Sequence, residues 1–252
     1  MLFRSPKVFV YNMIKGEFYK QRECVVLLFS VIVNAISGGG FSFANVLISI
    51  FASLAVIFLT MPVHEYAHAL IGTKLGDPTP KYTGRLSLNL FNHIDYMGAL
   101  CIILFGFGWA KPVQINGRNL NNPKRDMMLI ALAGPIANLI TAFICVLICV
   151  LLLNLFGDSA MFFSLFFSYI AQINCYLAFF NLIPIPPFDG SRVLTAILPN
   201  KYYYTLMRYE RYFTIIILGI IMLESRIGIV SRISNLTLTG MLEIATLLFS
   251  RT

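Results

Sequence analysis

Charged residues are scarce in this chain. Asp, Glu, Lys and Arg make up 12% of its 252 residues, about half of the share of roughly 25% that is usual in soluble domains. Hydrophobic residues make up 58%, and the mean hydropathy is +0.78. A soluble globule with so few charges could not cover its surface, so we interpret the chain as an integral membrane protein.

Paired cysteines are also missing. The five cysteines are odd in number, form no C-x-x-C pair and lie in or beside apolar runs. This pattern argues against a disulfide framework and favours small buried hydrophobic side chains.

The net charge of +8 does not indicate a nucleic-acid partner, because the basic residues are scattered between apolar runs. Apolar runs occupy 24–36, 43–72, 127–156, 161–180, 212–223 and 234–249. If each crosses a membrane once and the N-terminus is cytoplasmic, 17 of the 19 Lys and Arg lie on the cytoplasmic side, as the positive-inside rule requires. We therefore predict an all-α polytopic membrane protein with about six transmembrane helices, both termini cytoplasmic and 1–252 forming a single domain.

A further apolar run, 96–109, is too short for a crossing. As a helix it reaches about 21 Å, against a hydrocarbon core of about 30 Å. We predict a re-entrant segment here. Its flanks, 86–90 and 113–116, alternate apolar and polar residues, which is typical of short β-strands; an ordinary interfacial loop is the alternative.

The strongest chemical signal is His64-Glu65-Tyr66-Ala67-His68, which lies in the second apolar run. Residues i and i+4 share one helical face, so both imidazoles can bind one metal ion, with Glu65 beside them as a base for water. Ionisable residues inside a membrane span are costly and usually functional.

Two histidines leave a catalytic zinc site one ligand short. The best remaining donor is Asp189, which follows the Pro184, Pro186 and Pro187 segment. Irregular backbone at membrane depth is tolerated where it lines a cavity. His93 and Asp95 are the rival third ligands.

Two amides are candidate substrate contacts. Asn138 lies in Gly134-Pro135-Ile136-Ala137-Asn138, within an apolar run, and could donate a hydrogen bond to a substrate carbonyl. Membrane helices also use such residues to bind one another, and the same ambiguity holds for Asn181.

Together these residues resemble the site-2 protease family of intramembrane zinc metalloproteases. The resemblance covers about residues 45–200. It rests on four elements: His64-Glu65-x-x-His68, Gly134-Pro135-x-x-Asn138, Asn181-x-x-Pro184-x-Pro186-x-x-Asp189-Gly190, and Phe107-Gly108-Trp109-Ala110-Lys111-Pro112-Val113, which is similar to the family's re-entrant segment.

The resemblance implies one Zn²⁺ per chain, bound by His64, His68 and Asp189, with Glu65 as the catalytic base. It also raises Asn138 and Asn181 to substrate-binding candidates. Its implied substrates are transmembrane segments of other proteins within the lipid bilayer. We expect a compact form without PDZ or CBS domains, located in the cell membrane, with the active site towards the cytoplasm. A substrate strand could be held extended by β-addition near 86–90 or 113–116.

Two other functions are compatible with the metal motif. One is a membrane metalloprotease acting on peptides that enter from the cytoplasm; a glutamate as third ligand would favour it. The other is a non-catalytic membrane zinc-binding protein or zinc carrier, which needs the ligands but no base such as Glu65.

Overall fold

The computed structural model describes residues 54–105, 110–198 and 226–249, with a few single positions near 50 and 220. This part of the chain is mostly helical and contains no β-strand. The apolar run 24–36, most of 212–223 and Phe107–Trp109 of the expected re-entrant element lie outside the described residues.

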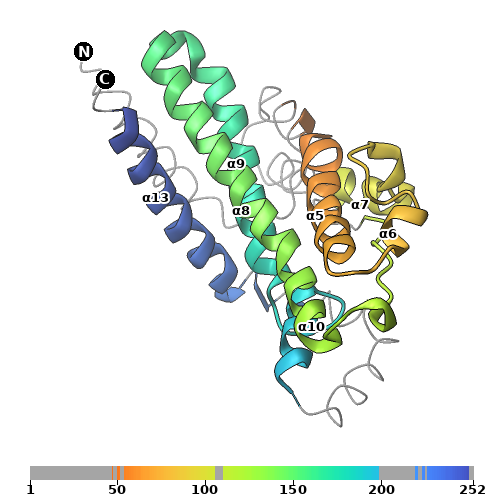
Figure 1. Ribbon diagram of the computed structural model, residues 1–252. Helices are drawn as coiled ribbons and strands as arrows, with labels where there is room; N and C mark the ends of the chain where they lie inside the picture. Colours follow the sequence, from red (N-terminus) through yellow and green to blue (C-terminus); the bar gives the residue numbers. More distant parts are fainter. Residues whose placement is uncertain are drawn as a thin grey trace.

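The longest helices form an antiparallel hairpin. Helix α8 (Pro123–Phe156) and helix α9 (Met161–Asn181) are joined by the short 3-10 turn η5 (Gly157–Ala160) and pack along their length (Figure 1). Gly157 closes α8 at φ +55°, ψ −135°, a conformation that side chains other than glycine's rarely permit. The two helices predicted over 127–156 and 161–180 are confirmed.

Within the described residues, one helical stretch, Pro123–Asn181, is long and apolar enough to cross a membrane. It comprises the whole α8–α9 hairpin. A third long helix, α13 (Ile229–Phe249), packs against both α8 and α9 (Figure 1). The six crossings and the positions of the termini stay predictions.

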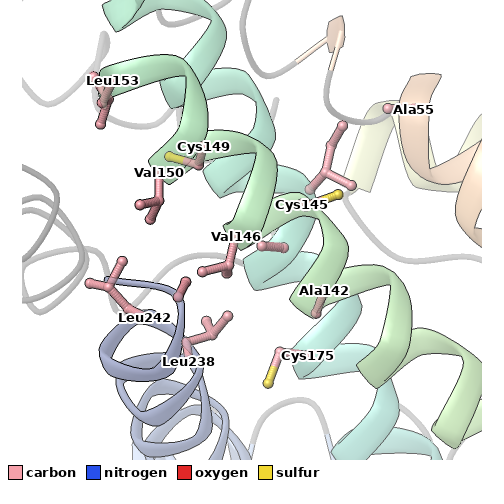
Figure 2. Packing of buried hydrophobic residues seen from close by; sticks show 13 residues of the cluster. Ala55, Ala142, Cys145, Val146, Cys149, Val150, Leu153, Cys175, Leu238 and Leu242 are labelled. Atoms are coloured by element: carbon pink, nitrogen blue, oxygen red, sulfur yellow. The ribbon is translucent and has the colours of Figure 1, made fainter. Parts of the chain in front are cut away.

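The core lies where α8, α9 and α13 meet (Figure 2). Small side chains are prominent there: Ala142, Ala171, Cys175 and Ala245 are all at most 1% exposed. Small residues let helix backbones approach closely, the usual packing of membrane helices. The cysteines of this region, Cys145, Cys149 and Cys175, are free and buried, as the sequence predicts.

The opposite side of α8 is apolar and exposed. Its stripe consists of Ile136, Ile140, Ile144, Leu151 and Leu155, which are 39–65% exposed. A helix that is apolar on its buried and exposed sides alike suits hydrocarbon surroundings better than water.

Helix α5 (Met61–Lys74) carries the His-Glu-x-x-His motif and packs against α8. It is preceded by a π-helical turn, η2 (Val56–Thr60), in which the N–H of Met61 donates to the carbonyl of Val56. Pro62 has no N–H to give to the Phe58 carbonyl, so the regular bonding pattern is interrupted two residues before His64. Such π turns often occur at functional sites.

Between α5 and α8 the chain forms short elements beside α5 (Figure 1). They are α6 (Thr79–Tyr82), η3 (Leu90–Asn92), α7 (Tyr96–Phe105) and η4 (Gly117–Asn119). The backbone N–H of Lys111 donates to the carbonyl of His93 at 2.9 Å. Lys111 therefore lies next to the start of α7, and a re-entrant path through a membrane stays a prediction.

The expected β-strands at 86–90 and 113–116 are wrong for this structure. At the first, the Asn89 side chain accepts a hydrogen bond from the N–H of Phe91 and starts η3 instead. At the second, the N–H groups of Val113 and Asn116 donate to the carboxylates of Glu65 and Asp77. Side chains thus take the groups that a strand ladder would use.

Candidate metal centre

Two imidazoles lie together on one face of α5. The Nε2 atoms of His64 and His68 are 3.0 Å apart, and their rings meet edge to face with centroids 4.7 Å apart. This is the consequence of the i, i+4 spacing on a helix.

The buried ring of His68 is oriented by α8. Its Nδ1–H donates to the carbonyl oxygen of Ile130 at 2.7 Å. Because a carbonyl can only accept, Nδ1 carries the proton and Nε2 keeps its lone pair for another partner. Metal-binding histidines typically have such an orienting bond. In the described part of the chain, the buried Nδ1 of His64 has no partner.

Asp189 completes the cluster from a distant part of the chain. Its Oδ2 lies 3.2 Å from Nε2 of His64 and 3.3 Å from Nε2 of His68. The residue begins helix α10 (Asp189–Ile197), after the irregular Pro-rich loop that leaves α9. A Cβ on Gly190 would lie 2.2 Å from the carbonyl oxygen of Leu182, so glycine is needed for this loop to bring Asp189 in.

Helix α8 approaches the two imidazoles through a glycine. A Cβ built on Gly134 would lie 2.4 Å from Nε2 of His68 and 2.5 Å from Cε1 of His64. No larger residue fits there without moving the rings. The sequence pattern drew attention to Gly134-Pro135 only because of the nearby Asn138 amide. The feature that could have indicated the contact with the imidazoles is the glycine in the middle of an apolar helix.

Glu65 contacts the segment that follows α7. Its Oε2 accepts a hydrogen bond from the backbone N–H of Val113 at 3.1 Å. Sequence reasoning did not foresee the Val113 contact, because no pattern links a helix residue to a backbone group 48 positions later.

Comparison with known proteins decides the family. The model of Peptidase family M50 matches residues 157–223. The protein named "Putative zinc metalloprotease YwhC" of Bacillus subtilis (strain 168) is 36% identical over 166 residues, which are 64% of this chain and 76% of the relative. The chain belongs to peptidase family M50, the site-2 protease family.

Two archaeal relatives from Methanocaldococcus jannaschii agree with this assignment. A protein with the same descriptive name, MJ0611, is 29% identical over 70% of this chain and 85% of its own length. "Zinc metalloprotease MJ0392" is 25% identical over 59% of this chain and 35% of its own length. No solved structure matches the chain.

Membership of the family makes this chain a zinc-dependent metalloprotease, and Zn²⁺ is its metal. The donor set can be tested against that ion. Zn²⁺ binds His nitrogen and carboxylate oxygen at about 2.0–2.2 Å in tetrahedral geometry, which places neighbouring donors roughly 3.3 Å apart. The three donor–donor distances here are 3.0, 3.2 and 3.3 Å, so the residues fit zinc.

The remaining candidates lie outside this cluster. His93 is buried, and its Nε2 is 2.6 Å from the Ser87 carbonyl. Asp95 accepts from the N–H of Gly98. Among the described residues, the group of His, Cys, Asp or Glu placed to hold a metal ion is His64, His68 and Asp189.

The two candidate substrate amides occupy different surroundings. Asn138 is 1% exposed, one helical turn after Gly134, and its Oδ1 has no partner among the described residues. Asn181 is the last residue of α9 and is partly exposed at the start of the loop that leads to Asp189. A third amide side chain, that of Asn174, donates a hydrogen bond from Nδ2 to the Thr60 hydroxyl at 2.9 Å and so links α9 to η2.

Proposed function

We propose that this metalloprotease cuts peptide bonds within or near transmembrane segments of other membrane proteins. In this proposal His64, His68 and Asp189 hold one Zn²⁺, and Glu65 is the catalytic base. The observation that carries the proposal is the contact of Gly134 with both imidazoles, because Gly134 belongs to the apolar α8–α9 hairpin.

The depth of the site follows from its place on α8. The charged start of that helix ends at Asp126, and the apolar run begins at Met127. Gly134 is seven residues further, which is roughly 10 Å along a helix. If the hairpin crosses the bilayer, the imidazoles lie about that far inside its polar boundary.

When bound, zinc supplies a Lewis acid that polarises a peptide carbonyl and activates water for attack. Glu65 takes a proton from that water and delivers it to the leaving nitrogen. The N–H of Val113 holds one carboxylate oxygen of Glu65 in place and leaves the other for proton transfer. The Ile130 carbonyl keeps His68 in the tautomer that offers Nε2.

Substrate would enter as an extended strand, because the turns of a helix shield its own peptide bonds. The segment 113–116, which forms no strand, lies beside the site, since Val113 contacts Glu65. Gln114 in this segment is exposed. Asn138 and Asn181 would contact the substrate on its other sides.

We infer that the site opens towards the cytoplasm in a multi-pass protein of the cell membrane, with 1–252 as one protease domain and both termini cytoplasmic. The distribution of basic residues supports this: the loop of 74–125 holds seven Lys and Arg, whereas the hairpin turn at 157–160 holds none.

Co-expression with a panel of single-span membrane proteins tests the function. The wild type should release a soluble cytoplasmic fragment whose new terminus, located by mass spectrometry, lies inside the span. Glu65→Gln should leave the same substrate intact. Equal fragmentation by both chains, or a cut far outside the apolar segment, would contradict the proposal.

A further inference from the structure

Helix α5 ends in a turn that places the buried carboxylate of Asp77 beside the segment 113–119, which contacts Glu65 through Val113. The N–H of Gly76 donates to the Thr73 carbonyl, and that of Asp77 donates to the Gly72 carbonyl at 3.0 Å. With Gly76 at φ +108°, this is a Schellman ending. It fixes Asp77 rigidly to the helix that carries His64, Glu65 and His68.

The Asp77 side chain is 0% exposed and accepts four hydrogen bonds. Two come from Thr79, from its N–H at 3.1 Å and its hydroxyl at 2.6 Å. The others come from the segment before α8: the N–H of Asn116 at 2.7 Å and the Nδ2 of Asn119 at 2.8 Å. One carboxylate therefore joins the end of α5 to residues far along the chain.

These cross-links hold the segment that contacts Glu65. Residues 110–116 are tied at their far end to Asp77 and at their near end to the His93 carbonyl through Lys111. Between the two ties, the N–H of Val113 donates to Glu65. Because residues 110–116 have no regular secondary structure, these hydrogen bonds to other elements are what hold their backbone in place.

We propose that Asp77 is a positioning residue for catalysis: its carboxylate holds the 113–119 segment in register with α5, so that the Val113 N–H orients Glu65. The inference rests on the proposed function, in which Glu65 is the base. Nothing in the geometry gives Asp77 a contact with the metal ligands, so its loss should change turnover and not zinc binding.

Two variants separate this role from a merely structural one. Asn119→Ala removes a hydrogen bond between the 113–119 segment and Asp77. Thr79→Val removes a hydrogen bond to the same carboxylate from a residue in its own turn. Both weaken the fold around Asp77. Only the first loosens the segment that reaches Glu65. Asn121→Ala is the matched control, because Asn121 is an exposed amide in the same loop.

The experiment measures kcat, KM, zinc content and unfolding temperature of each full-length variant in detergent with one cleavable membrane substrate. We expect Asp77→Asn to lower kcat about tenfold or more, with zinc retained and KM changed less. Asn119→Ala should lower kcat roughly threefold. Thr79→Val should lose less than Asn119→Ala, and Asn121→Ala should stay near the wild-type kcat.

Unchanged kcat in Asn119→Ala, or equal losses in Asn119→Ala and Thr79→Val, would overturn the inference. If Asp77→Asn does not accumulate as folded protein, the pair of Asn119→Ala and Thr79→Val decides alone. Glu65→Gln, measured alongside, separates the proposed function from the role of Asp77. Full activity in Glu65→Gln would refute the proposed function. An inactive Glu65→Gln together with a normal Asn119→Ala would refute only the role of Asp77.

Discussion

The Nδ1–H of His68 donates to the Ile130 carbonyl at 2.7 Å, and this bond couples the face of α5 that carries the two imidazoles to the apolar helix α8. It fixes the ring so that Nε2 faces His64 and Asp189. The candidate zinc centre is therefore built by packing between helices as much as by the His-Glu-x-x-His spacing.

The packing of α8 on the imidazoles gives the first prediction. Gly134→Ala should lower zinc affinity about 10–100-fold, because its Cβ would lie 2.4 Å from Nε2 of His68 and the ring cannot rotate away without losing the Ile130 bond. Gly240→Ala in α13 is the control, since a Cβ there meets nothing within 4 Å; it should keep full zinc affinity and gain up to about 1 kcal/mol of stability. Equal zinc affinity in both variants would contradict this packing.

The third ligand gives the second prediction. Asp189→Ala should lose zinc under conditions in which the wild type holds about one ion per chain, because two imidazoles leave the site under-coordinated. Asp158→Ala, at an exposed aspartate in the hairpin turn, should keep its zinc. Metal analysis of the purified proteins decides, and unchanged affinity in Asp189→Ala would contradict the role of Asp189 as the third ligand.

Asp77 gives a prediction on pH. Burial alone would raise the pKa of this carboxyl, but hydrogen bonds from Thr79, Asn119 and Asn116 outweigh it and hold the pKa below its ordinary value. A lowered folded-state pKa means that the ionised form stabilises the fold above the unfolded-state value of about 3.9, and that this stability is lost as the pH falls through the lower folded-state value.

The wild type should therefore exceed Asp77→Asn in stability by about 2 kcal/mol at pH 5–7, and the difference should shrink below about pH 4. Unfolding in detergent at pH 7, 5 and 3 measures it. All other titratable groups are the same in both chains, so the difference isolates Asp77. A gap that is as large at pH 3 as at pH 7 would show that the ionised carboxylate is not its source.

The cytoplasmic orientation is tested by labelling. Single cysteines, Asn121→Cys and Ser159→Cys, are introduced into a cysteine-free variant at two exposed positions. An impermeant thiol reagent on intact cells should label position 159, and position 121 only after permeabilisation. The reverse pattern would overturn the topology and, with it, release of the fragment into the cytoplasm.

Local sequence patterns were sufficient to predict the features that lie within a single helix. The spacing of His64 and His68 predicts two imidazoles on one face, and the apolar runs predict α8 and α9. Asp189 was inferred by weighing donor types, and the structure brings it to within 3.3 Å of both imidazoles.

The contacts between distant segments could not be predicted in this way. The alternation at 86–90 indicated a strand, yet the Asn89 side chain bonds to a neighbouring backbone group and starts η3. The bonds from Val113 to Glu65 and from Asn116 to Asp77 join residues 48 and 39 positions apart. Such bonds depend on how the elements pack, and no local periodicity records them.

The most direct test of the account is the zinc content and proteolytic activity of purified Glu65→Gln. Glu65 is bonded to Val113 and lies outside the ligand cluster, so the variant should bind about one zinc per chain, as the wild type does. Its cleavage of a transmembrane substrate should fall at least about a hundredfold, because the base is gone. Full cleavage by the zinc-loaded variant would contradict the central claim.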